Sequence, residues 1–287
     1  MGVPGALTSL LWVASFVAAP PSVDAGAEEC FSGGCSRPVP DDLKAQIADA
    51  ERVGPLIFEQ DEVSARATDV LYDRAPEATS AGKLRGWVTI PGPWWRVVFF
   101  VARGDDVAVG YELDYSADLP PERTRPTFRR IDPPREPDAE EAARFRAVRT
   151  AIAALSAARS ACGRNVNPVV LPGSTLSKKG WLVYLLASTQ EQGTVVQGGH
   201  QRFGISEDGR TVTSSDQLSR CSTQKVVKEM VGIGVSTPFY DAPNEGHVFT
   251  ALSTRLAFYL NTSRGTWSIK GARIRFFEQV QKADAGR

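Results

Sequence analysis

Two histidines, His200 and His247, are the only imidazole groups in the 287 residues, so any histidine-based catalysis must use one of them. An imidazole can act as the general base for a Ser or Cys nucleophile. Each histidine follows a glycine, which leaves the neighbouring backbone open to a ligand. The alternative is a hydrogen-bonded structural histidine at the start of a strand, and we favour this second interpretation.

Glu112 and Asp114 stand two residues apart on a predicted strand, so both side chains point to one face of the sheet. Paired carboxylates can supply the acid and the base that hydrolyse a glycosidic bond. Adjacent acids on a solvent-facing strand are commoner, and we expect that role here. Nearby aromatic residues could stack on a sugar ring, although core packing is the commoner use of such residues. These aromatic residues are Trp87, Trp94, Trp95, Phe99 and Phe100.

The segment from Ser222 to Lys225 matches the Ser-x-x-Lys pattern of penicillin-interacting enzymes. That chemistry needs the serine and the lysine on one helical turn, so that the amine can take the hydroxyl proton. Here the pattern precedes a valine-rich, strand-like segment, and we interpret it as a chance match. The sequence contains no phosphate-binding loop, dinucleotide fingerprint or calcium loop, and it suggests no cofactor.

An uncharged apolar run from Ala6 to Ala19 indicates export. Its length of about 14 residues is short for a membrane span, and small residues precede a possible cleavage site after Ala25. The sequence therefore predicts a cleavable signal peptide at residues 1–25. An uncleaved anchor is the alternative. We expect a periplasmic or secreted protein with no transmembrane segment after signal removal.

The four cysteines, Cys30, Cys35, Cys162 and Cys221, all follow the proposed cleavage site. An even number of cysteines in an exported chain favours disulfide bonds. Of the three possible pairings we favour Cys30–Cys35 with Cys162–Cys221. Zinc is the weaker alternative, because neither histidine stands at a metal-ligand spacing from a cysteine. We therefore predict no metal site.

Two helices are predicted early in the chain. The first is capped by Asp41 or Asp42, and Gly54-Pro55 ends it. The second spans residues 56–72. A third helix spans residues 138–163, where Asp138 and Glu141 form a capping box.

Segments rich in β-branched and aromatic residues predict strands, and short connections between them predict antiparallel pairing. Three such segments, at residues 87–90, 96–101 and 107–113, form a meander. The later ones are expected at residues 169–171, 181–188, 201–206, 211–214, 225–231, 248–253, 258–262, 266–269 and 273–277. The sequence thus predicts an α+β fold of antiparallel sheets packed with a few helices.

A Pro- and Arg-rich segment, residues 119–137, suggests the boundary between two parts of the chain. We expect it to be an extended, solvated connection, and an anionic-ligand site is the alternative. Residues 26–118 would then hold the first helices and the three-stranded meander. Residues 138–287 would hold a helix followed by an antiparallel sheet.

Three segments are similar to parts of uncharacterised exported bacterial α+β proteins of unknown function. They are EQDEVSARATD at residues 59–69, GGHQRF at residues 198–203 with the Asp208-Gly209 turn, and EGHVF at residues 245–249. The resemblance implies export and an α+β fold, and it implies no activity. Arg202, within the second segment, joins the two histidines, Glu112 and Asp114 as a candidate ligand-site residue.

The amino-acid composition limits the classes of function that the protein could have. The hydrophobic fraction of 42% is sufficient for a packed core, and 33 basic against 33 acidic residues argue against a general nucleic-acid binder. We therefore expect a non-enzymatic binding or interaction protein of the cell envelope or the cell exterior. The alternative is a hydrolase that acts on envelope polymers, with His200 or the Glu112/Asp114 pair as its reactive groups.

Overall fold

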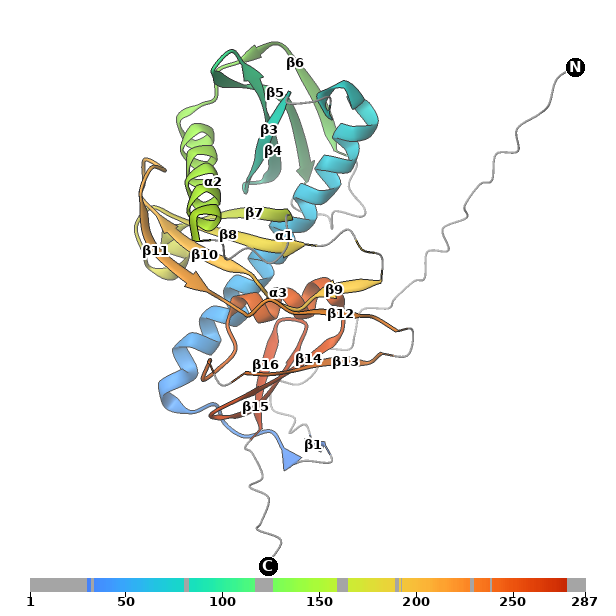
Figure 1. The fold of residues 1–287 in the computed structure, drawn as a ribbon, viewed down its shortest axis with the longest axis vertical. Helices are drawn as coiled ribbons and strands as arrows, with labels where there is room; N and C mark the ends of the chain where they lie inside the picture. The colour runs from blue at the N-terminus through green and yellow to red at the C-terminus, as the bar shows by residue number, and fades with distance from the viewer. Residues whose placement is uncertain are drawn as a thin grey trace, which may run out of the picture.

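The computed structural model describes residues 30–31, 34–79, 83–116, 126–158, 165–188, 191, 193–227, 230–237 and 239–277. Within these ranges the chain has a mixed α+β fold, with three α-helices, three four-stranded sheets and two short two-stranded sheets (Figure 1). The α+β prediction is confirmed. The predicted signal peptide, residues 1–25, lies outside the described residues. No helix in the described part of the chain is both long enough and apolar enough to cross a membrane.

The first sheet contains the predicted meander and follows it in chain order. Its antiparallel strands are β3 (Leu84–Ile90), β4 (Trp94–Arg103), β5 (Asp106–Ser116) and β6 (Thr127–Arg135). Helix α2 (Ala139–Ala158) packs on one face of this sheet, and the second half of α1 (Lys44–Arg74) packs on the other (Figure 1).

Strand β6 corrects the prediction that residues 119–137 are an irregular connection. Their second half pairs with β5, whereas residues 117–125 lie outside the described residues. Two features of β6 accommodate its prolines. It is an edge strand, and its pairing is interrupted between Arg130 and Arg135, so Pro133 and Pro134 are not required to donate to the ladder.

The second sheet, in the middle of the molecule, has the order β11-β10-β8-β7 (Figure 1). Its strands are β7 (Asn165–Pro172), β8 (Trp181–Ser188), β10 (Gln201–Ile205) and β11 (Val212–Gln217), and the Asp208-Gly209 turn lies between the last two. Apolar residues of this sheet share one core with α2 and the first sheet. Phe100 and Val109 lie in this core together with Val183 and Phe203. The chain therefore does not divide into two separate cores at residues 119–137.

The third sheet has the order β13-β14-β15-β16 and packs against α3 (Glu245–Thr254). Its strands are β13 (Gly232–Ser236), β14 (Ala257–Thr262), β15 (Gly265–Lys270) and β16 (Arg273–Phe277). The two short sheets pair β1 (Cys30–Phe31) with β2 (Gly34–Cys35), and β9 (Thr194–Val196) with β12 (Thr223–Lys225).

Three strand predictions are wrong in this region. Residues 248–253 belong to α3, because Asn244 caps a helix there. The strand expected at residues 225–231 is replaced by β12, which ends at Lys225, and by β13, which begins at Gly232. Strand β13 runs parallel to β14, so the sheet is not entirely antiparallel.

The two predicted early helices are one continuous helix, α1, that runs along the length of the molecule (Figure 1). Pro55 lies inside it rather than at its end. Gly54 is required for packing: a Cβ atom there would lie 2.4 Å from Val248 Cγ1, so the glycine permits a close approach of α1 to α3. The Gly-Pro pair therefore serves the contact between two helices.

The middle of α1 joins two sheets through Gln60, which is 1% exposed. Its amide nitrogen donates to the carbonyl of Thr89 at 2.7 Å, and its amide oxygen accepts from the backbone N–H of Val170 at 3.1 Å. Thr89 and Val170 lie on β3 and β7, which are edge strands of different sheets. One side chain thus satisfies backbone groups that would otherwise be buried without a partner.

Candidate functional site

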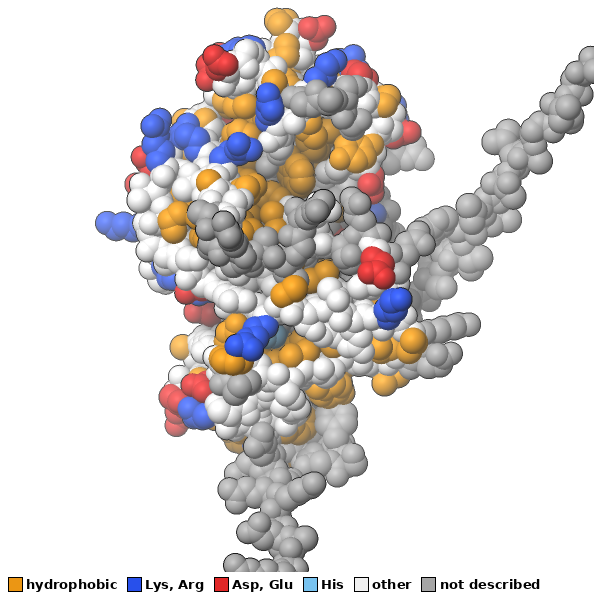
Figure 2. Space-filling view, viewed as in Figure 1, with side chains coloured by type: hydrophobic (Ala, Val, Ile, Leu, Met, Phe, Trp, Pro, Cys, Tyr) orange, Lys and Arg blue, Asp and Glu red, His pale blue; other side chains and the backbone are white. Residues whose placement is uncertain are grey.

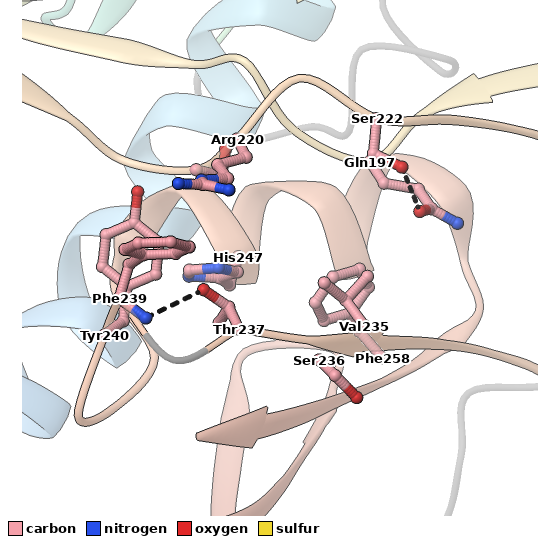
Figure 3. A pocket seen from close by; sticks show the side chains of 11 residues that line it. Gln197, Arg220, Ser222, Val235, Ser236, Thr237, Phe239, Tyr240, His247 and Phe258 are labelled. Atoms are coloured by element: carbon pink, nitrogen blue, oxygen red, sulfur yellow. Dashed lines mark hydrogen bonds between the residues drawn. The ribbon is translucent and has the colours of Figure 1, made fainter. Parts of the chain in front are cut away.

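A cavity of about 240 Å³ lies beside the N-terminal turn of α3. We call it the α3 cavity. Polar residues from four segments line it, namely Gln197, Ser219, Arg220, Ser222, Ser236, Thr237 and His247. Its apolar and aromatic wall consists of Val235, Phe239, Tyr240 and Phe258. Figure 3 shows Arg220 and Ser222 on one side of this space, Val235, Ser236 and Phe258 on the other, and His247 on the helix between them.

The first turn of α3 places His247 at the cavity. The side chain of Asn244 accepts hydrogen bonds from the backbone N–H groups of Gly246 and His247, at 3.0 and 3.4 Å. In return, the ring Nδ1 of His247 accepts a hydrogen bond from the backbone N–H of Asn244 at 3.2 Å. This reciprocal pair is a capping box in which histidine occupies the position usual for Glu or Gln. It fixes the orientation of the ring.

The capping bond also determines which nitrogen of His247 carries the proton. Burial, with the charge of His200 as a second cause, lowers the pKa of His247 to about 3, so the ring is neutral at pH 7. Because Nδ1 accepts a hydrogen bond, the proton resides on Nε2. No described residue accepts from Nε2, so His247 offers one N–H donor at the cavity.

Arg220 contributes a positive charge. Its guanidinium carbon lies 3.4 Å from the centre of the Phe239 ring, a stacked arrangement that holds the cation at the cavity. Within the described ranges Arg220 forms no ion pair with an acidic side chain. The band of surface at the height of β12 and β13 carries few charged side chains on the face shown in Figure 2. The charge of Arg220 is therefore available to a ligand.

Ser219 adds a hydroxyl group, and it is only 5% exposed. Its Oγ is buried and has no hydrogen-bond partner in the part of the chain that the structure describes. Because this oxygen has almost no accessible surface and lies close to Gly198, it does not itself face the cavity. Arg220 and His247 are thus the two donors that the described residues present to this space.

The glycines before His200 pack against the loop that carries Ser219 and Arg220. A Cβ atom at Gly198 would lie 2.1 Å from the carbonyl oxygen of Arg220, and Gly199 has a φ of 87°. The backbone N–H of Gly199 donates to the carbonyl of Ser219 at 3.1 Å. The sequence suggested that these glycines leave the backbone open to a ligand. They instead allow one loop to pass closely against another.

His200 itself is 1% exposed, and both of its ring nitrogens have partners. Nδ1 accepts from the backbone N–H of Ala187 at 3.1 Å, and Nε2 lies 3.3 Å from the hydroxyl of Thr250. Burial lowers its pKa to about 4. The surroundings of His200 are those of a hydrogen-bonded buried histidine directly before a strand.

Arg202 belongs to a buried polar group at the start of α3. It contacts Glu245 at 2.5 Å and Asp216 at 2.9 Å, and the hydroxyl of Tyr184 also donates to Glu245 at 3.1 Å. Since its charge is paired on both sides, Arg202 links β10 to α3 and does not face the α3 cavity.

Glu112 and Asp114 lie on one face of β5, as predicted, and basic side chains cover them. We call this group the Glu112 cluster. Arg129 contacts both acids, at 2.7 and 2.9 Å, and Arg135 bridges Glu112 to the fully buried Glu141 of α2. Burial raises the pKa of Glu112, but the hydrogen bonds and charges of Arg135 and Arg129 outweigh it, and the pKa is lowered. Glu112 is thus ionised at neutral pH and has no proton to donate as a general acid.

The other sequence candidates have structural surroundings. Ser222 lies in a loop and Lys225 in β12, so they do not share a helical turn. Phe99 and Phe100 are fully buried and Trp95 is 9% exposed, whereas Trp94 is 58% exposed. The aromatic residues therefore belong mainly to the core.

The cysteine pairing stays a prediction. Cys30 lies directly opposite Cys35 in the register of β1 and β2, as a bond between them requires, and Cys162 lies outside the described residues. No free cysteine occurs within the described ranges. Cys221 stands between Arg220 and Ser222 on the rim of the α3 cavity.

Sequence reasoning missed Arg220, Ser219 and Asp61. Asp61 borders a second cavity of about 180 Å³, where His200 and Phe249 also lie. Burial raises the pKa of Asp61 to about 6, partly offset by a hydrogen bond from Asn167. Arg220 and Ser219 belong to no motif, and their proximity to Cys221 was the only available signal.

No protein-family model matches this chain, and no match was found among curated proteins or among solved structures.

Proposed function

We propose that the protein is an exported binding protein that holds the carboxylate or similar anionic group of a ligand in the α3 cavity. The observation that carries this proposal is Arg220, a cation at a cavity with no acidic partner among the described residues. His247 supplies a neutral donor next to it. Charge-assisted hydrogen bonds to such donors are the usual means of binding a carboxylate.

The proposal of export rests on the apolar N-terminal run and on the even number of cysteines. The similarity of three segments to exported bacterial proteins supports the same proposal. One of these segments contributes to the α3 cavity, since His247 belongs to it.

The alternative, a hydrolase acting on envelope polymers, has less support. Neither histidine forms a hydrogen bond with a carboxylate or a serine in the described part of the chain, and both accept a backbone N–H. Glu112 and Asp114 both form ion pairs with Arg129, and the pKa of Glu112 is lowered rather than raised. Acid–base catalysis requires a group that changes its protonation near the working pH.

A titration with small carboxylates tests the binding proposal. N-acetylvaline, added to the folded protein and followed by NMR, should shift the signals of Arg220 and His247, and N-acetylvaline amide should not. Arg220→Ala should weaken binding at least tenfold because, among the described residues that line the cavity, Arg220 alone is charged. The matched control is Arg149→Ala, which removes an exposed arginine of α2. Equal binding of acid and amide, or unchanged binding by the Arg220 variant, would refute the proposal.

A further inference from the structure

The α3 cavity continues along an open edge of a sheet. Strand β13 is the first strand in the order β13-β14-β15-β16, so one of its sides is unpaired within the described part of the chain. Proteins commonly protect such edges with proline, with charged residues or with a bulge. The sequence of β13, Gly-Ile-Gly-Val-Ser, contains none of these, and its pairing with β14 is regular.

The backbone hydrogen bonds show which groups of β13 face outward. The N–H of Thr237 donates to the carbonyl of Asn261 on β14 at 2.8 Å. Backbone groups alternate along a strand, so Val235 also faces β14, whereas Gly234 and Ser236 direct their N–H and C=O groups to the free edge. A Cβ atom at Gly234 would meet nothing within 4 Å, so the face of β13 on which that Cβ would lie is also open at this position.

The C-terminal end of the free edge lies beside the hydrogen-bond donors of the α3 cavity. Val235, Ser236 and Thr237, at the C-terminal end of β13, line the cavity together with Arg220 and His247. Figure 3 shows Val235 and Ser236 on the strand below the space and Arg220 above it. A chain that paired with β13 and ended here would place its terminus at the guanidinium.

The size of the cavity limits what can enter. A volume of about 240 Å³ is below the range of about 300–1,000 Å³ that is typical for a drug-sized ligand. It suits one residue with an apolar side chain, against Val235 and Phe258, and a carboxylate at Arg220. The rest of a longer ligand would lie outside, along the edge of β13.

We infer that β13 and the α3 cavity together bind the C-terminal end of an extended peptide from another protein. The peptide would run parallel to β13, because its carboxylate must lie at the C-terminal end of that strand. Main-chain hydrogen bonds to Gly234 and Ser236 would supply affinity, and the cavity would select an apolar last residue with a free carboxylate. This inference rests on the proposed anion-binding function of Arg220.

Fluorescence polarisation with labelled degenerate hexapeptides that end in valine tests the inference. Peptides with a free C-terminus should bind at least tenfold more tightly than N-acetylvaline, because the edge of β13 adds hydrogen bonds. Their C-terminal amides should bind at least tenfold more weakly. N-methylation of successive peptide bonds should have alternating effects, since only every second N–H of the peptide faces β13.

A protein variant provides the complementary test. Gly234→Pro removes an outward N–H of β13 without removing one that faces β14, and it should weaken hexapeptide binding but not N-acetylvaline binding. The N-methylated peptides make the same test on unaltered protein if this variant does not fold. Equal affinity of the hexapeptide and N-acetylvaline, or no effect of N-methylation, would refute the peptide inference and leave anion binding intact. If neither the hexapeptide acid nor N-acetylvaline binds, both proposals fail.

Discussion

The Glu112 cluster and the α3 cavity are both groups of polar side chains between secondary-structure elements, and they differ in how completely their charges are paired. In the Glu112 cluster, Glu112 and the fully buried Glu141 both contact Arg135. In the α3 cavity, Arg220 has no acidic partner among the described residues. Paired charges stabilise a fold, whereas an unpaired charge beside unsatisfied donors is available to a ligand.

The comparison also shows that residue type and spacing alone do not identify a site. Glu112 and Asp114 have the spacing expected of catalytic carboxylates, yet Arg129 and Arg135 cover them. Arg220 and Ser219 belong to no motif, and the fold brings them to His247. The polar groups that remain without partners after folding are the better guide to function.

The largest loss in the free energy of unfolding should follow removal of Cys162 and Cys221. A covalent link at Cys221 would fix the loop in which Arg220 and Ser222 line the α3 cavity. We expect Cys162→Ala/Cys221→Ala to lower the free energy of unfolding by about 4 kcal/mol, as the chain-entropy model gives for a closed loop of about 60 residues. Binding of N-acetylvaline should weaken as well, since Arg220 and Ser222 flank Cys221. Urea unfolding with and without reductant measures the first effect.

The matched control is Cys30→Ala/Cys35→Ala, which removes a short loop near the terminus and should cost less. Non-reducing peptide mapping identifies the bonds directly. Recovery of Cys30 or Cys35 joined to Cys162 or Cys221 would contradict the pairing.

The next largest loss in the free energy of unfolding should follow a mutation in the Glu112 cluster. Arg135→Ala leaves Glu112 and Glu141 without their shared partner, and we expect a loss of about 2–3 kcal/mol in the free energy of unfolding. Asp114→Ala is the control: Asp114 is 22% exposed and contacts only the rim of the cluster at Arg129, so its loss should stay under about 1 kcal/mol. Neither variant should change ligand binding. A cost for Arg135→Ala as small as that of its control would show that the paired cluster does not stabilise the fold.

Lowering the pH should produce the smallest and most gradual change in the free energy of unfolding. The pKa values of His200 and His247 are lowered to about 4 and about 3, so below about pH 6.5 the unfolded chain binds protons that the folded chain does not. Stability is therefore full above that pH and falls as the pH drops. Asp61 acts in the opposite direction, because its pKa is raised to about 6 and the folded state binds its proton first.

The two histidines outweigh one aspartate, so we expect a net loss of about 1 kcal/mol per pH unit between roughly pH 6 and pH 4.5. Asp61→Asn should make the loss steeper, about 2 kcal/mol per pH unit, because it removes the opposing group. Urea unfolding at a series of pH values measures both slopes. Equal slopes for the two proteins would show that Asp61 is not protonated preferentially in the folded state.

Much of the fold was predictable from local patterns. The strand at residues 181–188 and the Asp138–Glu141 capping box are confirmed, with the two capping hydrogen bonds at 2.8 Å. Helix α3 was missed because β-branched and aromatic residues suggested a strand, and because histidine replaced the usual Glu or Gln of its capping box. The prolines of β6 misled because they lie where the ladder needs no N–H from them. Pro55 misled because α1 continues through it, although a proline inside a helix removes one backbone hydrogen bond.

The candidate site was predictable only in part. His247 attracted attention because the sequence contains just two histidines. Its role as a neutral donor follows from the hydrogen bond with Asn244, a tertiary detail of the cap. Arg220 and Ser219 could not be found from sequence, because their significance lies in partners that they lack after folding.

Helix α1 has a consequence for how the chain reaches its folded state. Its first turns, with Ile47 and Ala50, pack against Trp267 and Ile274 near the other end of the described chain. Its last turns, with Val63 and Leu71, pack against the first sheet. During synthesis the helix emerges early, while the strands that pack against its first half emerge last, so the apolar face of that first half stays exposed until nearly all of the described chain is available. Contacts of such large sequence separation slow folding. The core around the first half of α1 can therefore be completed only after the last described strands have been synthesised.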